Sequence, residues 1–286
     1  MKRSPINYMG GKFNSLKFIL PNIPKKINTF YDVFAGSATV ALNVEASNYV
    51  INDRVTPLIE LHEYLISNNY EKIYSNILED ISQYELYNLD GNGYSRLRKE
   101  YNEDKCPRKL YALTQHSFNY LMRFNMKGEF NASFGKGKCK LGKNALYKLR
   151  GYTNHFNNDN TITLNKDFRD LIDITTIKTG DYVYLDPPYE QTLANYNERR
   201  GFTGWDKSDA EDVREMLVGL DKNGISFGYS NTIISKGLIN DRLVEFIKEN
   251  DFYVYSKEGF INGVPSTRKH RGKDVEVFIT NIKEVA

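Results

Sequence analysis

Short apolar runs alternate with helical patterns at both ends of the chain, and this alternation restricts the fold more than any other feature. Near the amino terminus, Phe30–Phe34 and Tyr49–Asn52 are rich in aromatic and β-branched residues, as is typical of buried strands. Apolar residues recur at helical spacing after each run, over Ser37–Ala46 and over Thr56–Ser67. The pattern predicts a strand–helix–strand unit followed by a further helix.

The same alternation returns after residue 181. The predicted strands there are Tyr182–Leu185, Ile225–Ser230, Phe252–Tyr255 and Val275–Ile279, and the predicted helices are Asp209–Leu220 and Leu238–Lys248. Strands that alternate with helices favour an α/β fold with a doubly wound, mostly parallel sheet of the Rossmann-like kind. We therefore expect residues 1–68 and 166–286 to form one domain.

The stretch between them, residues 69–165, has a different character. Helical patterns recur at Glu71–Leu78, Lys109–Met122 and Leu141–Phe156, without a clear series of strands. From Lys105 to Arg150 there are 11 Lys and Arg residues against Glu129 alone. Such a local excess of positive charge suits the neutralisation of phosphates, although a solvated basic face would have the same composition. We expect a mainly helical, inserted domain.

Several classes of protein are excluded by what the sequence lacks. Its 2 cysteines among 286 residues cannot form a disulfide framework, and no Cys/His spacing typical of a zinc site occurs, so we expect no metal. No apolar run approaches the ~18 residues that suggest a membrane span. The first residues carry charge but no apolar signal region follows them, so we expect a cytoplasmic protein that does not bind membranes.

The tetrapeptide Asp186-Pro187-Pro188-Tyr189 follows a predicted strand directly. Open α/β sheets bind ligands at the carboxyl ends of their strands, and two successive prolines make this turn stiff. Asp186 and the carbonyl of Pro187 can each accept one hydrogen from a planar NH₂ group, while the ring of Tyr189 stacks against the base. Alternatively, the four residues are a structural turn that closes the strand.

A second candidate site follows the strand predicted at Phe30–Phe34. Gly36 lies in a tight turn before a predicted helix, where backbone N–H groups can face a ligand. Asp53 ends the next strand, where a carboxylate can hold ribose hydroxyls. Only one glycine of a G-x-G-x-x-G fingerprint is present, which favours a nucleoside cofactor without phosphates. An ordinary turn with Asp53 as a helix cap would fit equally well.

These segments, taken in order, resemble the N6-adenine-specific DNA methyltransferases of the Dam type (D12 class, alpha group). The matching segments are Y-M-G-G-K at Tyr8–Lys12, D-V-F-A-G-S at Asp32–Ser37, Asp53, D-P-P-Y at Asp186–Tyr189, and Ser230-Asn231. Within the basic stretch, residues 118–125 and 127–135 are similar to the recognition segment of that family. The resemblance covers nearly the whole chain.

The resemblance implies S-adenosylmethionine as methyl donor and double-stranded DNA as substrate, with the target adenine flipped out of the duplex. It implies catalytic roles for Asp186, Pro187 and Tyr189. The cofactor-binding residues implied by position are Tyr8, Lys12, Asp32, Phe34, Gly36, Asp53, Asp167, Phe168 and Asp186. The implied DNA-binding residues are Asn7, Phe118, Asn119, Leu121, Arg123 and Ser133. Trp205 could close the adenine pocket or simply pack in the core.

Some questions stay open at this point. Relatives that read GATC have Lys in place of Asn7 and Pro in place of Ser133, so a GATC-like target is one of several options. Amino methylation of cytosine N4 or of RNA needs the same acceptor geometry, and a catalytically silent DNA-binding module would keep the fold. We expect a monomer in a bacterial or phage-infected cell, with a cognate restriction endonuclease as a further partner.

Overall fold

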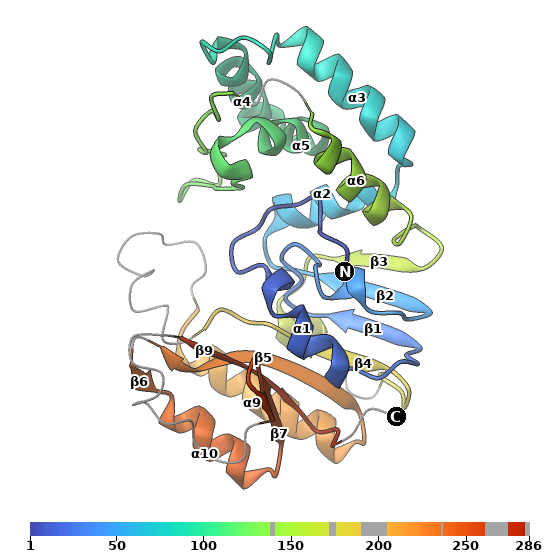
Figure 1. Ribbon diagram of the computed structural model, residues 1–286, viewed down its shortest axis with the longest axis vertical. Helices are drawn as coiled ribbons and strands as arrows, with labels where there is room; N and C mark the ends of the chain where they lie inside the picture. Colours follow the sequence, from blue (N-terminus) through green and yellow to red (C-terminus); the bar gives the residue numbers. More distant parts are fainter. Residues whose placement is uncertain (138–140, 172–175, 190–204, 236, 261–273, 284–286) are drawn as a thin grey trace.

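One mixed sheet organises the molecule (Figure 1). The computed structural model describes residues 1–137, 141–171, 176–189, 205–235, 237–260 and 274–283. Within them the strand order is β3-β2-β1-β4-β5-β9-β7-β8, and β6 pairs with β5. The strands are β1 (Thr29–Asp32), β2 (Asn48–Asn52), β3 (Thr161–Leu164), β4 (Tyr182–Leu185), β5 (Ser226–Ser235), β6 (Leu238–Ile239), β7 (Tyr253–Ser256), β8 (Gly259–Phe260) and β9 (Val275–Thr280).

The strands from β3 to β5 are parallel, whereas β9 pairs antiparallel with both β5 and β7. From β1 the chain builds outward to β2 and β3, and it later returns to place β4 on the other side of β1. Neighbouring strands β1 and β4 therefore flank a topological switch point, where α/β sheets bind their ligands. The predicted α/β, Rossmann-like fold is confirmed.

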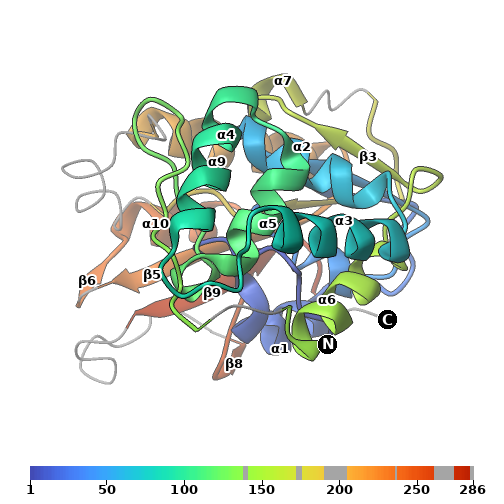
Figure 2. The same ribbon diagram turned by 90° about the horizontal axis from the view of Figure 1, so that it is seen from above.

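Helices cover both faces of the sheet, and further helices form a lobe at its β3 side (Figure 1). The α-helices are α1 (Leu16–Ile19), α2 (Thr56–Ile66), α3 (Tyr70–Gln83), α4 (Asn92–Asp104), α5 (Pro107–His116), α6 (Lys143–Thr153), α7 (Phe168–Leu171), α9 (Lys207–Lys222) and α10 (Asp241–Glu249). Short 3₁₀ turns are η1 (Lys12–Asn14), η2 (Leu20–Asn22), η3 (Ala41–Asn43) and η4 (Phe118–Tyr120). Seen from above, α3, α4 and α5 overlie the sheet (Figure 2).

Two apolar cores lie on opposite faces of the sheet because side chains alternate along each strand. In β4, Tyr182 and Tyr184 belong to one core, while Val183 and Leu185 belong to the other. The second core is closed by α9 and α10. No helix in the described part of the chain is long and apolar enough to cross a membrane.

The helical lobe shares the first of these cores with the sheet. A single cluster of buried residues runs from Phe30 of β1 through Leu61 of α2 to Leu113 of α5 and Leu149 of α6. All four side chains are fully buried. The lobe therefore packs against α2 over a continuous apolar interface and is not connected to the sheet by a flexible linker alone.

Three predicted helices differ from the structure. No α-helix forms over Ser37–Ala46, because Ala38 adopts a left-handed φ of 51° and only η3 follows it. The helix predicted at Lys109–Met122 stops at His116, and Ser117 turns to extended backbone with its hydroxyl bonded to the carbonyl of Leu121. The helix predicted at Leu238–Lys248 begins only at Asp241, capped by Asn240, because Leu238 and Ile239 form β6.

Two elements within residues 69–165 were not predicted. The helix α4 is mostly polar, and its buried side chains are confined to a narrow stripe that contains Tyr94, Leu97 and Tyr101. One strand also lies within this mainly helical stretch, since Thr161–Leu164 forms β3 and pairs in parallel with β2. A run of four residues is too short to show the alternation of apolar and polar side chains that predicts a strand. Pairing with β2 determines that these residues are extended.

Candidate active site

Three carboxylates gather at the carboxyl edge of the central strands. Asp32 ends β1, Asp53 follows β2, and Asp186 follows β4. In the β1–β4 pairing Asp32 lies opposite Tyr184, two residues before Asp186. The predicted Gly turn and the D-P-P-Y turn are thus brought together at the switch point.

Asp186 is held by two neighbours. Its Oδ2 lies 2.8 Å from Nζ of Lys12, and its Oδ1 accepts a hydrogen bond of 3.2 Å from the hydroxyl of Tyr189. Burial raises the pKa of Asp186 to about 6, and the nearby charge of Glu276 adds to the rise, although Lys12 opposes it. A largely desolvated carboxylate with a perturbed pKa and a specific charged partner is a common mark of a functional site.

Glu276 of β9 joins this cluster and is not among the site residues predicted from the sequence. Its Oε1 accepts a hydrogen bond of 3.0 Å from the hydroxyl of Tyr189 and lies 3.3 Å from Nζ of Lys12. Its Oε2 accepts a hydrogen bond from the hydroxyl of Ser15. The available signal was a carboxylate inside an otherwise apolar predicted strand, which requires a partner if it is buried.

Asp32 is almost completely buried, with 2% of its surface exposed. Its Oδ1 has no hydrogen-bond partner among the described residues. Burial, with a further contribution from the charge of Asp186, raises the pKa of Asp32 well above its usual range. An orphaned buried acceptor beside the D-P-P-Y turn fits a site that a ligand completes.

The turn after β1 is built around Gly36, which has a φ of +50°. A Cβ at this position would lie 3.3 Å from Cδ1 of Tyr8, so the tyrosine ring can rest directly on the turn. The N–H of Gly36 donates to Oδ2 of Asp53 at 3.0 Å, and Oδ1 of Asp53 accepts from the N–H of Val55. The N–H of Gly36 is thus engaged by Asp53, and the prediction that backbone N–H groups of this turn face a ligand stays a prediction.

His62 of α2 completes the turn, and no motif or spacing in the sequence marks it as a functional residue. It is fully buried, its Nε2 lies 2.8 Å from the carbonyl oxygen of Gly36, and its Nδ1 pairs with the hydroxyl of Tyr152 in α6. Burial lowers the pKa of His62 to about 4, so the ring is neutral at pH 7. Nε2–H therefore donates to Gly36 while Nδ1 accepts from Tyr152.

Three aromatic rings form an apolar cluster next to the carboxylates. Phe34 lies 5.3 Å from Phe168 and 5.6 Å from Trp205, between ring centroids. Nε1 of Trp205 is buried without a hydrogen-bond partner among the described residues. Asp167, which precedes Phe168, pairs with Arg169 at 3.1 Å and lies 3.6 Å from Arg54. The cluster offers an apolar surface for a flat ring.

The predicted recognition residues lie on an exposed loop of the lobe. Phe118 is 56% exposed, and the next two residues, Asn119 and Tyr120, have left-handed φ angles of 52° and 57°. Nδ2 of Asn7 donates to the carbonyl oxygen of Asn119 at 2.8 Å. Asn7 thus connects the amino-terminal segment with this loop.

The other predicted recognition residues stabilise the same loop. Nε and Nη2 of Arg123 each donate to Asn131 at 2.8 Å, one to the side chain and one to the backbone carbonyl. The carbonyl oxygen of Ser133 accepts from the N–H of Phe118 at 2.7 Å, and Leu121 is partly buried against the core. Isolated bridges Ser117–Phe134 and Phe124–Phe130 close the loop into a hairpin-like shape.

Part of the basic charge of the lobe is used internally. Arg108 forms a double contact with the buried Asp80 of α3 and also pairs with Glu79, and Lys109 pairs with Glu100 and Asp104 of α4. All four of these carboxylates precede Lys105 in the chain. The excess of Lys and Arg counted over residues 105–150 therefore overstates the net positive charge of the lobe.

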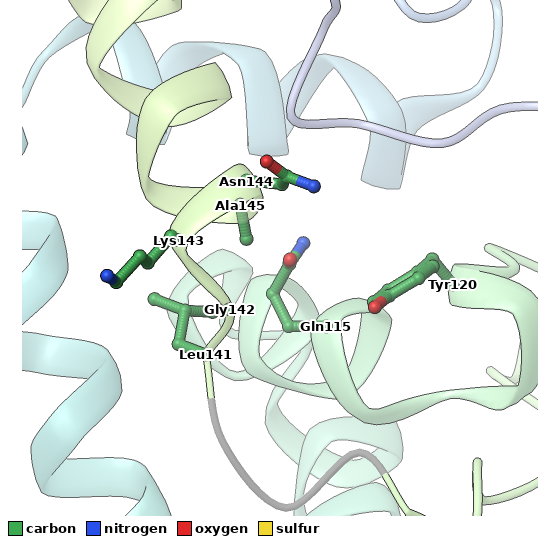
Figure 3. A pocket seen from close by; sticks show the side chains of 7 residues that line it. All are labelled: Gln115, Tyr120, Leu141, Gly142, Lys143, Asn144 and Ala145. Atoms are coloured by element: carbon green, nitrogen blue, oxygen red, sulfur yellow. The ribbon is translucent and has the colours of Figure 1, made fainter.

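A cavity of about 230 Å³ lies in the lobe, away from the carboxylates (Figure 3). The lining residues are Gln115, Tyr120, Leu141, Gly142, Lys143, Asn144 and Ala145. The amides of Gln115 and Asn144 point toward one another, whereas Lys143 points away (Figure 3). Among the described residues no group of His, Cys, Asp and Glu could hold a metal ion.

The sheet, the switch-point carboxylates and the helical lobe define an α/β protein with a Rossmann-like ligand site and an inserted lobe. The chain belongs to the D12 class N6 adenine-specific DNA methyltransferases, whose family model matches residues 8–262. The resemblance seen in the sequence motifs is thereby confirmed.

Individual relatives agree with the family match. The chain is 34% identical over 281 residues to modification methylase StsI of Streptococcus sanguinis and 32% identical over 280 residues to type II methyltransferase M.FokI of Planomicrobium okeanokoites. Each of these alignments covers 98% of this chain but 43% of the relative, so the chain spans less than half their length. DNA adenine methylase of Salmonella typhi is 28% identical over 240 residues, with 76% of this chain and 77% of that protein covered.

Proposed function

We propose that the chain transfers a methyl group from S-adenosylmethionine to the N6 amino group of an adenine flipped out of double-stranded DNA. The observation that carries this proposal is the partly buried Asp186, which lies beside Tyr189 at the switch point and has a pKa raised to about 6. Family membership and relatives named as adenine and modification methylases support it. They give no support to methylation of cytosine N4 or RNA, or to a silent binding module.

The residues around Asp186 fit the cofactor. Asp186 and Glu276 carry more negative charge than Lys12 balances, which favours a cationic sulfonium ligand. The cluster of Phe34, Phe168 and Trp205 suits an adenine ring. When bound, the cofactor would supply a methyl carbon on a positively charged sulfur that leaves as a neutral thioether, and the methylated amine would give up one proton to water.

In this proposal the D-P-P-Y turn orients the amine. Asp186 and the carbonyl of Pro187 accept the two N6 hydrogens, so the nitrogen lone pair turns away from the purine ring toward the methyl carbon. The ring of Tyr189 stacks on the flipped base. Tyr8, Lys12, Asp32 and Gly36 bind the cofactor around this point, with Asp53 supporting the Gly36 turn. Asp167, which pairs with Arg169, and the neighbouring Phe168 are further cofactor-binding residues in this proposal.

The lobe binds DNA in the same proposal. Residues 69–160 form the target-recognition domain, which ends before β3 because β3 completes the sheet of the catalytic domain. Phe118 and Asn119 enter the space that the adenine leaves, and Arg123, Leu121, Ser133 and Asn7 read or brace the neighbouring bases. The target sequence, a monomeric state and a partner restriction endonuclease stay predictions.

Replacement of Asp186 tests the proposal. We expect Asp186→Ala to lower the methylation rate by about a hundredfold or more, with cofactor affinity changed by less than about tenfold. Asp170→Asn, an exposed carboxylate on α7, is the matched control and should leave the rate unchanged. The measurement is transfer of labelled methyl to duplex DNA, followed by digestion to identify the modified base. Label in cytosine, or full activity of Asp186→Ala, would contradict the proposal.

A further inference from the structure

Lys12 occupies the oxygen of Asp186 that a substrate amine would need. Its Nζ lies 2.8 Å from Oδ2 of Asp186, and the hydroxyl of Tyr189 occupies the other oxygen, Oδ1, at 3.2 Å. Oδ2 is thus engaged before any base enters, while Oδ1 shares the single hydroxyl hydrogen of Tyr189 with Glu276. A hydrogen donor on the substrate must compete with an ammonium group, and charge-assisted hydrogen bonds of this kind are about twice as strong as neutral ones.

Glu276 provides a second acceptor for both of these donors. Its Oε1 lies 3.3 Å from Nζ of Lys12 and 3.0 Å from the hydroxyl of Tyr189. Lys12 is only 9% exposed, so an ammonium group displaced from Asp186 has little access to water and needs another anion. Glu276 is already in reach, so Lys12 can change partner without a large movement.

The position of Glu276 is itself fixed. Its Oε2 accepts from the hydroxyl of Ser15, which is buried next to α1, and its backbone lies in the paired strand β9. The carboxylate is thus held from two elements that are distant in sequence from Asp186. A free, mobile glutamate would not be expected to hold the same two donors as the catalytic aspartate.

We propose that Glu276 is a positioning residue that takes over the ammonium of Lys12 and the hydroxyl of Tyr189 when Asp186 accepts a hydrogen from the substrate amine. This inference rests on the proposed function, because it assigns Asp186 to the amine. It adds a residue from β9, outside the D-P-P-Y turn, and a role for Lys12 beyond cofactor contact.

Glu276→Gln tests this role because it removes the charge and keeps the shape. We expect the single-turnover rate of methyl transfer to fall about tenfold or more, with cofactor affinity within about threefold of the unchanged protein. The groups facing Asp186 are Lys12, Glu276, Tyr189, Tyr184 and Asp32. Loss of the Glu276 charge lowers the pKa of Asp186, so the acidic limb of the pH–rate profile should move to lower pH.

Three further variants make the result decisive. Glu276→Asp retains the charge, so the acidic limb of its pH–rate profile should lie where it does in the unchanged protein. Glu245→Gln, on the exposed face of α10, should have the rate and the pH–rate profile of the unchanged protein. If Glu276→Gln does not fold, Ser15→Ala replaces it, with an expected loss of about threefold in rate because Glu276 loses one anchor. An unchanged rate, or a lower rate with an unmoved acidic limb, overturns the inference. Absence of adenine methylation by the unchanged protein would instead overturn the proposed function.

Discussion

At the scale of single residues, the protonation state of Asp186 sets when the site can work. The carboxylate must be ionised to accept an amine hydrogen, and burial raises its pKa to about 6. Lys12 opposes this rise, and Glu276 supports it. The group therefore titrates closer to neutral pH than an exposed aspartate does.

The consequence is a dependence of activity on acidity. We expect the single-turnover rate of methyl transfer to fall about tenfold for each pH unit below about 6, because protonated Asp186 cannot accept the hydrogen. The rate should be level from about pH 7 upward until other groups titrate. DNA and cofactor binding, measured at each pH, separate this effect from weaker binding. A level rate down to pH 5 would contradict it.

Residues of the D-P-P-Y turn could be predicted because their chemistry lies in four consecutive positions. Glu276 and His62 could not, because their roles depend on partners that are distant in the chain. Glu276 contacts Ser15 and Lys12 from the opposite end of the sequence, and His62 connects Gly36 with Tyr152. Spacing along one sequence carries no information on such pairs. Arg123 shows the converse, since its bonds to Asn131 add a structural role to the predicted recognition role.

At the scale of elements, local pattern predicted strands better than helix ends. The run Tyr182–Leu185 matches β4 residue for residue, because all four side chains are buried and the following Asp186-Pro187 ends the strand. Ser37–Ala46 has helical spacing but forms turns, because Ala38 is left-handed and the hydroxyls of Ser37 and Thr39 bond to one another. Tertiary contact with Tyr8 and Asp53, not local propensity, decides the turn.

The helix α4 offers a test of how closely the lobe is packed. A Cβ on Gly93 would lie 1.7 Å from the carbonyl oxygen of Tyr84, so α4 must shift to accept it. We expect Gly93→Ala to lower the free energy of unfolding by about 3 kcal/mol. Urea unfolding followed by circular dichroism measures this loss.

Gly151 in α6 is the matched control for Gly93. It also lies within a helix, but a Cβ there would meet no atom within 4 Å. Gly151→Ala should raise the free energy of unfolding by about 0.5–1 kcal/mol, because alanine has the higher helix propensity. Equal effects of the two substitutions would show that the contact with Tyr84 does not restrict α4.

At the scale of the whole molecule, the shared apolar core couples the lobe to the sheet. Phe30, Leu61, Leu113 and Leu149 belong to one buried cluster although they come from the sheet, α2 and the lobe. We therefore expect the lobe and the sheet domain to unfold in one transition, although their sequences differ in charge and in secondary-structure pattern.

Two optical signals can follow the two parts separately. The single tryptophan, Trp205, packs against Phe34 and Phe168 beside the sheet, while the helices of the lobe contribute strongly to circular dichroism. Leu113→Ala in α5 should lower the midpoint of both urea transitions, with a loss of about 2–5 kcal/mol. A tryptophan transition that stays in place while the dichroism transition moves would show independent domains.

The apolar core shared by the lobe and the sheet also affects the design of hybrid enzymes with new target sites. An exchange of the recognition segment between relatives would cut through the packing between Leu61 and Leu113, leaving each half of the hybrid with a mismatched partner surface. Crossover points outside α2, so that this helix travels with the transplanted segment, keep the surface between α2 and the lobe matched and move the new junction to the surface between α2 and the sheet. The boundary suited to hybrids is therefore set by packing, and it differs from the boundary suggested by charge.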